Sequence, residues 1–275
     1  MWNSKDIYYI SDSTGILINT LGQALLCQFP EISFHEEKFP YVRTVKDAER
    51  TLAYIREQST GRQPIIFSTI MDPDVRNVFK QSEIDFFDTF EFFLEPLEDC
   101  LEARALRVPG FSRQRAYSDM SKRVDAIHYC LDHDDGIKVE EFDDADVILL
   151  GVSRAGKTPV SVYLGTQMGL KAANYPLTTD DFKEFDLPDK IKRYKKRAIG
   201  LTTSPELLHS IREKRYTSSK YAKLTTCIEE IEQAEAIYHR NHIPIVSTAG
   251  KSIEEIATEI SQELGLAKKS GNLTK

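Results

Sequence analysis

Gly151-Val152-Ser153-Arg154-Ala155-Gly156-Lys157-Thr158 fits the phosphate-loop pattern G-x-x-x-x-G-K-[ST]. In such a loop, backbone N–H groups surround phosphates, the lysine reaches the β- and γ-phosphates, and the Ser or Thr hydroxyl binds Mg²⁺. The apolar run 147–150 precedes the loop and predicts a buried strand. Apolar residues from Val160 to Met168 recur at helical spacing. This order of strand, loop and helix predicts a nucleotide-binding protein.

Composition limits the class of protein. The 275 residues suffice for two domains of ordinary size or one large one. Apolar residues make up 41% and charged residues 29%, which is typical of a globular protein with a sizeable core. The 36 basic and 43 acidic residues leave a net charge of −7, which argues against a general nucleic-acid binder.

The cysteines and the hydropathy pattern indicate a cytoplasmic protein. Cys27, Cys100, Cys130 and Cys227 form no C-x-x-C pair, so we expect reduced thiols and neither a zinc site nor a disulfide framework. No apolar run approaches the ~18 residues that a membrane span requires, and the N-terminus lacks a signal-peptide pattern. We therefore expect no membrane association.

The first part of the chain alternates strands and helices. Strands are predicted at 7–10, 31–39 and 64–70. Helices are predicted after the turn Ser11–Gly15 as far as about Gln28, from Val45 to near Gly61, and after Asp72-Pro73. This β-α-β-α-β order predicts a parallel sheet covered by helices.

The second part of the chain follows a break at 107–118, which reads as a loop or linker. A helix is predicted at 121–131, followed by the phosphate-loop unit and by strands at 198–201 and 243–246. Ser252 and Glu255 form a capping box for a last helix that ends before Gly265. The predicted fold is α/β, with an N-terminal parallel α/β unit (1–108) and a C-terminal P-loop kinase-like α/β domain (109–275).

Asp12 is a candidate site residue, because it lies in the turn after the first predicted strand. Open α/β sheets place ligand-binding groups at this position, beside a helix N-terminus. The alternative is a helix N-cap network formed by the residues Ser11, Asp12, Ser13 and Thr14. The residues alone leave both interpretations open.

His133-Asp134-Asp135-Gly136 places an imidazole beside two carboxylates just after a predicted helix. A general base or a Mg²⁺ partner could be built from these groups. The alternative is a solvated helix C-terminus closed by Gly136 in the left-handed conformation, and the residues alone favour it.

Two basic groups are ambiguous in the same way. Arg212 and Arg215 lie three apart on a predicted helix and could form a phosphate clamp, although an exposed helical face is the commoner outcome. The basic run 190–197 could contact phosphates or an acidic protein, although a solvated segment is again commoner.

An acidic residue is absent where a standard phosphate-loop ATPase carries one. The predicted strands 198–201 and 243–246 continue into Thr202 and Ser247, not into an aspartate that would hold Mg²⁺ through water. This weakens the motor-ATPase and GTPase interpretations and favours a small kinase-like unit whose metal is held partly from elsewhere.

The chain resembles the family of phosphoenolpyruvate synthase regulatory proteins and pyruvate, phosphate dikinase regulatory proteins. Similar segments occur in order over nearly the whole chain, and the Val-Ser-Arg inside the loop is more specific than the loop pattern. At Ser13 many members carry glycine, and the region 83–118 matches least. The matching segments are 9–15, 126–129, 133–136, 145–159, 171–177, 200–202, 211–215 and 252–257.

This resemblance implies a bifunctional enzyme that acts on phosphoenolpyruvate synthase. It implies phosphorylation of a threonine of the synthase with ADP as donor and AMP as product. It also implies the reverse modification, in which that phosphate passes to inorganic phosphate and pyrophosphate is released. The similarity favours the synthase branch over the dikinase branch, and a homodimer is compatible with it.

Carried over by position, residues Gly151 to Thr158 would bind ADP, with Lys157 on the transferring phosphate and Thr158 on Mg²⁺. The resemblance also implies catalytic roles for Asp12 and for His133, Asp134 and Asp135, with one of the two adjacent carboxylates orienting the target hydroxyl. Two alternatives stay open: an ATP-dependent small-molecule kinase, and a nucleotide-responsive binding module without catalysis.

Overall fold

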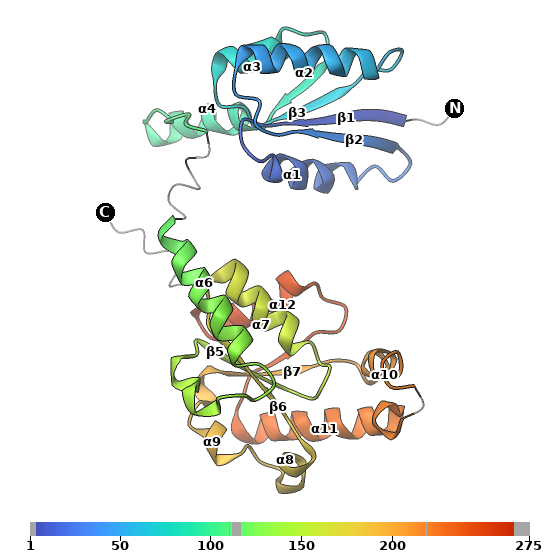
Figure 1. Cartoon of the computed structure of the whole chain (residues 1–275), viewed down its shortest axis with the longest axis vertical. Coiled ribbons are helices and arrows are strands. Elements are labelled where there is room, and N and C mark those ends of the chain that lie inside the picture. The colour runs from blue at the N-terminus through green and yellow to red at the C-terminus, as the bar shows by residue number, and fades with distance from the viewer. Residues whose placement is uncertain (1–3, 110, 112–116, 218, 267–275) are drawn as a thin grey trace. The chain divides into compact units, whose positions relative to one another are not determined.

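The computed structural model describes residues 4–109, 111, 117–217 and 219–266 of the chain. It divides into two compact units, Met1–Arg115 and Ala116–Lys275, each built around a four-stranded parallel sheet (Figure 1). The predicted α/β class is therefore confirmed. Within the described ranges, no helix is both long and apolar enough to cross a membrane.

The sheet of the N-terminal unit has the order β2-β1-β3-β4, and all of its strand pairs are parallel. Its strands are β1 (Ser4–Ile10), β2 (Ser33–Phe39), β3 (Ile65–Ser68) and β4 (Asp85–Asp88). Its helices are α1 (Ile16–Leu26), α2 (Val45–Gln58), α3 (Pro73–Lys80) and α4 (Thr89–Leu101). Helices α2 and α3 cover one face of this sheet, and α1 covers the other (Figure 1).

Alternation along β1 produces the two apolar layers of this unit, because successive side chains of a strand point to opposite faces. Tyr8 and Ile10 pack in the cluster that contains residues of α2 and α3. Ile7 and Tyr9 pack with Ile18 of α1 on the other face. Since β1 is buried on both faces, it has the apolar run that an internal parallel strand requires.

The sheet of the C-terminal unit has the order β6-β5-β7-β8, again with parallel pairs only. Its strands are β5 (Val147–Gly151), β6 (Ala172–Pro176), β7 (Ala198–Thr202) and β8 (Ile245–Ser247). Its longer helical segments are α6 (Tyr117–Asp132), α7 (Lys157–Tyr163), which continues as the π-helix η2 (Leu164–Met168), α10 (Pro205–Glu213), α11 (Leu224–Asn241) and α12 (Ile253–Glu263). Short helical segments are η1 (Val139–Asp144), α8 (Thr179–Glu184), α9 (Asp189–Lys192), η3 (Lys195–Arg197) and η4 (Lys220–Ala222).

The central strand β5 is buried along its whole length and divides the core of this unit. Val147 and Leu149 face the cluster formed by α7 and α12, whereas Ile148 and Leu150 face the cluster that contains α11. The strand therefore delivers its last residue, Gly151, at a fixed place on the carboxyl edge of the sheet.

Most predicted elements are confirmed, and the differences have local causes. The last strand begins at Ile245, two residues later than predicted, because Pro244 has no N–H to donate to the ladder; its carbonyl accepts from Gly200 N. Helix α6 begins at Tyr117, inside the predicted linker 107–118. Residues 110 and 112–116 of this linker lie outside the described ranges. The capping box of Ser252 and Glu255 is present at α12.

Candidate active site

Strand, loop and helix meet at the predicted residues: Gly151 ends β5, and Lys157 begins α7. Both loop glycines have a structural reason. Gly156 has φ 95°, a conformation that residues with a Cβ rarely adopt. A Cβ on Gly151 would lie 3.2 Å from the carbonyl oxygen of Leu201. The turn therefore favours glycine at both positions, for its left-handed backbone at Gly156 and for the close approach of Leu201 at Gly151.

Lys157 is buried inside this loop, with 5% of its surface exposed. Its Nζ donates to the carbonyl oxygens of Gly151 and Val152, both at 3.0 Å. Burial lowers the pKa of Lys157 to about 8, and the charges of Asp135 and Asp134 act in the opposite direction. An ammonium group held in this way is poorly compensated, so it favours an anionic partner.

Asp134 is brought to the loop by tertiary contacts. Thr158 Oγ1 donates to its carboxylate, with 2.9 and 3.0 Å to the two oxygens. The amide of Asn174, a fully buried residue of β6, donates to the same carboxylate and to Ser161 Oγ. Two oxygen groups of the type that Mg²⁺ prefers, a hydroxyl and a carboxylate, thus lie side by side.

Backbone hydrogen bonds hold the segment 133–136 against β6. Asn174 N donates to the carbonyl oxygen of His133 at 2.9 Å, and Gly136 N donates to that of Asn174 at 2.8 Å. Asp135 and Gly136 both have left-handed backbones, with φ 51° and 77°. The predicted left-handed Gly136 is confirmed, and the same turn places the carboxylate of Asp134 beside Thr158 and leaves Asp135 exposed.

His133 is buried and contacts residues of α6 and η1. It is 3% exposed, and its ring stacks on that of Tyr129 with 3.8 Å between the centroids. Its Nδ1 lies 2.8 Å from the carbonyl oxygen of Tyr129, and its Nε2 lies 3.3 Å from a carboxylate oxygen of Glu141. These contacts orient its ring toward α6 and η1, and its predicted catalytic role stays a prediction.

Arg212 corrects the expectation of an exposed helical face, because it is completely buried. Its guanidinium donates to the carbonyl oxygen of Ser153 at 2.9 and 3.3 Å and lies 2.6 Å from the carboxylate of Glu230. The group also stacks over the ring of Tyr221. Arg212 follows the buried Leu208 by one helical turn, and this spacing is the signal in the sequence that could have placed it on the inner face.

The strands β7 and β8 end in Thr202 and Ser247, where a standard ATPase would carry an aspartate, and threonines follow both of them. Thr248 Oγ1 donates to the carbonyl oxygens of Ala155 (3.4 Å) and Thr202 (3.1 Å). The hydroxyl of Thr203 is buried and has no hydrogen-bond partner within the described ranges. Sequence reasoning did not single out Thr203 or Asn174, since each is a common polar residue whose position only the sheet order reveals.

Asp12 belongs to the N-terminal unit, at the carboxyl end of β1. It is 4% exposed, and its Oδ2 accepts from Met71 N at 2.8 Å. Burial raises the pKa of Asp12 above its usual range. The N-cap residue of α1 is Gly15, which provides no side-chain cap, so the N-cap interpretation of Asp12 is wrong. Its predicted participation in the chemistry of the loop stays a prediction.

Comparisons with known proteins cover nearly the whole chain. A family model described as "Kinase/pyrophosphorylase" matches residues 7–261. A protein of Desulfotalea psychrophila is 46% identical over 96% of this chain and 97% of its own length. A protein of Shewanella denitrificans is 42% identical over 95% and 97%, and one of Legionella pneumophila is 39% identical over 96% and 98%. All three are named as phosphoenolpyruvate synthase regulatory proteins.

Proposed function

Because this chain belongs to the kinase/pyrophosphorylase family of phosphoenolpyruvate synthase regulatory proteins, we propose that it reversibly phosphorylates phosphoenolpyruvate synthase. In the kinase direction, a threonine oxygen of the synthase bonds to the β-phosphorus of ADP, and AMP leaves with the bridging oxygen. The threonine proton passes to a base. In the other direction, an oxygen of inorganic phosphate attacks the phosphothreonine, the threonine oxygen regains a proton, and pyrophosphate is released.

The arrangement of Lys157, Thr158 and Asp134 is the observation that carries this proposal. It combines a buried cation with a hydroxyl–carboxylate pair at the carboxyl edge of a parallel sheet, where ligands of open α/β folds bind. Phosphoryl transfer requires mainly positioning and compensation of negative charge. One loop can serve both directions, because each of them brings a phosphate donor and a phosphate acceptor together.

Lys157 contributes charge stabilisation. An entering phosphate would replace the carbonyl oxygens of Gly151 and Val152 as partner of its Nζ. Because the side chain is shielded from water, this interaction would be stronger than at an exposed lysine. The unpartnered hydroxyl of Thr203 offers a further hydrogen-bond donor at the same edge.

The residues present fit Mg²⁺. Thr158 and Asp134 provide two oxygen donors, and no group of three or more His, Cys, Asp or Glu residues suited to a metal occurs in the described part of the chain. Mg²⁺ commonly takes one or two protein oxygens and completes its shell with water and substrate phosphates. When bound, the ion would neutralise phosphate charge.

Asp135 is the carboxylate that we assign to the threonine proton. Asp134 is already engaged by Thr158 and Asn174, whereas Asp135 is exposed one residue further on, within electrostatic reach of Lys157. An exposed carboxylate beside the transferring group can orient the hydroxyl and accept its proton.

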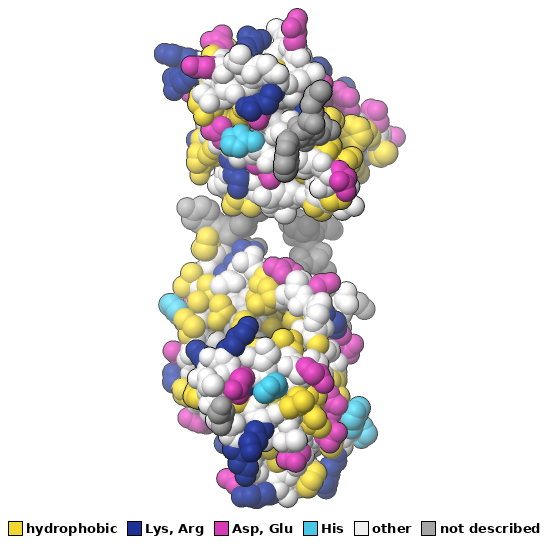
Figure 2. Space-filling view, turned by 90° about the vertical axis from the view of Figure 1, so that its right-hand side faces the viewer, with side chains coloured by type: hydrophobic (Ala, Val, Ile, Leu, Met, Phe, Trp, Pro, Cys, Tyr) yellow, Lys and Arg dark blue, Asp and Glu magenta, His cyan; other side chains and the backbone are white. Residues whose placement is uncertain are grey.

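The proposed partner is a protein and not a nucleic acid. On the face shown in Figure 2, Lys and Arg side chains are interspersed with Asp and Glu side chains and form no continuous basic surface among the coloured residues. The net charge of −7 agrees with this. We place the reaction in the cytoplasm, where ADP and the synthase would meet the enzyme.

The test uses purified protein, phosphoenolpyruvate synthase and β-labelled ADP, after removal of adenylate kinase, which interconverts the nucleotides. We expect label on a threonine of the synthase, AMP as product, and release of labelled pyrophosphate when inorganic phosphate is added. A parallel reaction contains γ-labelled ATP. Labelling from ATP at the same rate as from ADP would favour an ordinary kinase, and turnover of ATP on a metabolite without the synthase would favour a small-molecule kinase.

A further inference from the structure

The side chain of Asn174 lies between the two oxygen groups of the phosphate-loop site and the core. Asn174 is the middle residue of β6, pairs with Leu149 of β5 and is fully buried. Asparagine is mostly exposed in proteins, and a buried amide is normally held by hydrogen bonds. The reaction proposed above uses Asn174 in no step, although its amide contacts Asp134.

Asn174 connects the hydroxyl and the carboxylate of the site through a ring of hydrogen bonds. Its Nδ2 donates to Asp134 Oδ1 and, at 3.3 Å, to Ser161 Oγ. Ser161 Oγ donates in turn to the carbonyl oxygen of Thr158 at 3.0 Å. Thr158 Oγ1 donates to Asp134, which closes the ring. The amide therefore fixes the carboxylate relative to the helical turn that carries the hydroxyl.

The orientation of this amide leaves one of its own atoms unpaired. Asn174 Oδ1 is buried and has no hydrogen-bond partner within the described ranges. A buried acceptor without a partner typically costs about 1–3 kcal/mol. In the flipped amide, Oδ1 would face the carboxylate of Asp134, which has no proton to donate when it is ionised. The observed orientation thus satisfies Asp134 and leaves the amide oxygen as the unpaired group.

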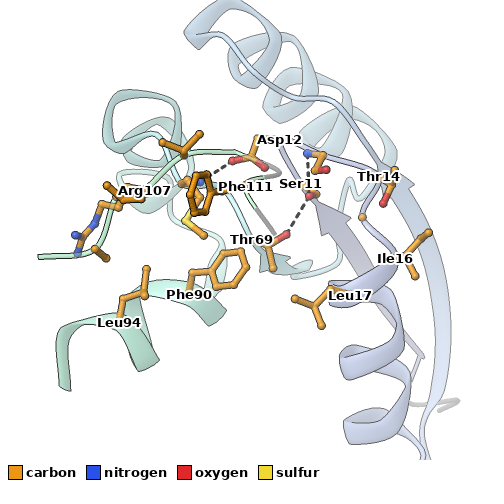
Figure 3. Close-up of a pocket in the computed structure, with 16 residues that line it drawn as sticks. Ser11, Asp12, Thr14, Ile16, Leu17, Thr69, Phe90, Leu94, Arg107 and Phe111 are labelled. Atoms are coloured by element: carbon orange, nitrogen blue, oxygen red, sulfur yellow. Dashed lines mark hydrogen bonds between the residues drawn. The ribbon is translucent and has the colours of Figure 1, made fainter. Parts of the chain in front are cut away.

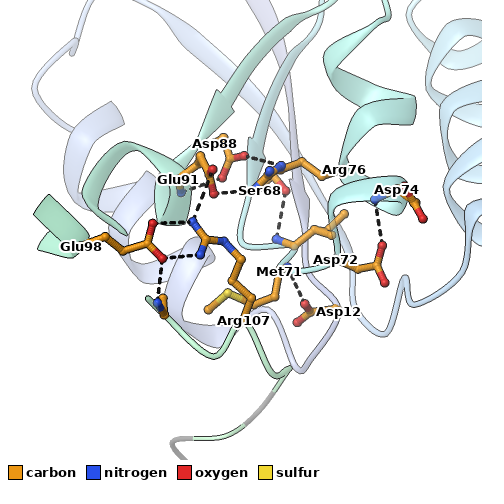
Figure 4. A network of polar contacts seen from close by, with 12 residues as sticks. Asp12, Ser68, Met71, Asp72, Asp74, Arg76, Asp88, Glu91, Glu98 and Arg107 are labelled. Carbon is orange, nitrogen blue, oxygen red and sulfur yellow. Dashed lines mark hydrogen bonds and ion pairs between the residues drawn. The ribbon is translucent and has the colours of Figure 1, made fainter. Parts of the chain in front are cut away.

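Carboxylates of the N-terminal unit are held by arginines. Arg107 donates to Glu98, and Asp88 lies 3.2 Å from Nε of Arg76 (Figure 4). In such pairs the arginine also compensates the charge of the carboxylate. Asp134 differs, because its partners are a hydroxyl and an amide, and it forms no ion pair with another described residue. Neutral donors orient this carboxylate and leave its negative charge for a cation.

Asp12, in the loop that follows β1, is held by the main chain. Its Oδ2 accepts from the backbone N–H of Met71. The hydroxyls of Ser11 and Thr69, which lie beside it, bond to each other (Figure 3). A backbone donor remains after any substitution other than proline. The amide donor to Asp134 belongs to a side chain, so its effect on the carboxylate can be removed by substitution.

We propose that Asn174 is a positioning residue for a divalent cation. It holds the carboxylate of Asp134 beside Thr158, so that the two oxygen groups form a site before the metal and the nucleotide bind. Groups that orient a ligand carboxylate typically contribute about 10–100-fold to metal affinity. This inference rests on the proposed function in one respect, because it takes Thr158 and Asp134 as the protein oxygens that hold the metal.

Titration of Mn²⁺ into the full chain saturated with ADP tests this proposal without the synthase. Mn²⁺ stands in for Mg²⁺ because both favour octahedral oxygen sites, and EPR measures the free ion. We expect Asn174→Ala to weaken Mn²⁺ binding by about 10-fold or more. ADP affinity measured in a chelator should change by less than about 2-fold. The backbone hydrogen bonds of residue 174 to His133 and Gly136 remain, so the turn should persist; Asn174→Ser replaces the variant if it unfolds.

A double-mutant cycle separates positioning from a general loss of packing. In an Asp134→Ala background the carboxylate is absent, so Asn174→Ala should cause no further loss of Mn²⁺ affinity. The phosphates of ADP still bind Mn²⁺ in this background, so its affinity stays measurable. The matched control is Asn241→Ala, because Asn241 donates to Asp186 at 3.0 Å elsewhere in the same unit. This control should change Mn²⁺ affinity by less than about 2-fold.

The outcomes distinguish this inference from the proposed function. Unchanged Mn²⁺ affinity in Asn174→Ala, or an equal loss with and without the carboxylate of Asp134, would overturn the positioning role even if the synthase is labelled normally. If the wild type failed to label the synthase but showed the expected coupling in Mn²⁺ binding, the proposed function would fall and the positioning role would stand. In an active enzyme, Asn174→Ala should also raise the Mg²⁺ concentration that gives half the maximal rate by about 10-fold.

Discussion

The two units share a sheet order and differ in the loop that follows the first strand. Both loops end in a left-handed glycine, Gly15 with φ 72° and Gly156 with φ 95°, directly before a helix. The N-terminal loop carries the carboxylate of Asp12, whereas the C-terminal loop carries the ammonium of Lys157. The comparison teaches that the same strand order positions a loop in each unit, while one buried side chain gives that loop its charge.

Burial acts on both charged groups in the same way. It raises the pKa of Asp12 and lowers that of Lys157, so in each case the charged form is the disfavoured one. Each group gains most from a partner that restores its charge or its hydrogen bonds. We expect phosphate to do so for Lys157.

The largest expected effect is that of Lys157→Ala. Both directions of transfer should fall by about 10²–10³-fold or more, the usual cost of removing one group that stabilises the charge of a transition state. Synthase labelling and pyrophosphate release measure the two directions, and circular dichroism checks the fold. The exposed Lys214 provides the control variant Lys214→Ala.

Asp12→Asn, assayed beside Lys157→Ala, can break the comparison between the loops. If it abolished transfer to the same extent in a folded protein, both loops would belong to one reaction. Near-normal activity of Lys157→Ala would instead remove the C-terminal loop from the chemistry.

Asp135→Asn should lower transfer by about 10²-fold, the usual scale of a general acid–base contribution. Asparagine tolerates the left-handed backbone at this position, so the fold should persist. ADP affinity measured without metal should change little. The control is Asp132→Asn, which removes an exposed carboxylate paired with Lys138. Normal rates in both Asp135→Asn and Asp134→Asn would leave this turn with a structural role only.

Arg212→Gln should destabilise the C-terminal unit by about 2 kcal/mol, because the carbonyl group of Ser153 and the carboxylate of Glu230 lose a buried partner. The loop should also hold ADP less tightly, so KM for ADP should rise. Urea unfolding and initial rates measure the two effects. Arg215→Gln changes an exposed position three residues further on, so the free energy of unfolding and KM for ADP should stay unchanged. If the two variants changed these quantities equally, a supporting role of Arg212 would be contradicted.

The smallest expected effect concerns pH. Since the pKa of Lys157 is lowered from 10.5 to about 8, the unfolded chain binds more protons between these values, and stability should rise with pH across this window. Lys157→Met removes the buried charge, so this variant should be more stable than the wild type at pH 7 and should lose most of that advantage by pH 10.5. Urea midpoints against pH test this, and Lys214→Met shows what loss of an exposed lysine does. If the urea midpoints of Lys157→Met and the wild type differed by the same amount at every pH, this would contradict the argument that burial lowers the pKa of Lys157.

Local patterns were sufficient for most of the fold. The strands that were predicted at 7–10 and 198–201, the loop Gly151–Thr158 and the capping box at Ser252 all depend on residues close in sequence. The strand β4 and the helix α4 were not predicted, because β4 has only two apolar residues between aspartates and α4 contains Pro96. Strand β4 is stabilised by pairing with β3, and helix α4 by contacts such as that of Glu91 with Arg76 of α3.

The candidate site, too, has features that depend on local sequence and features that depend on tertiary contacts. The amino-acid sequence by itself determined that a lysine-bearing turn lies between a buried strand and a helix, because glycines at two positions and apolar periodicity around them are local requirements. Only the tertiary structure decided that Asp134 contacts Thr158, that Asn174 supports it, and that Arg212 is buried against Ser153. These contacts join residues 24 to 59 positions apart. They exist because parallel strands bring their carboxyl ends to one edge, and the order of those strands is a property of the packed sheet.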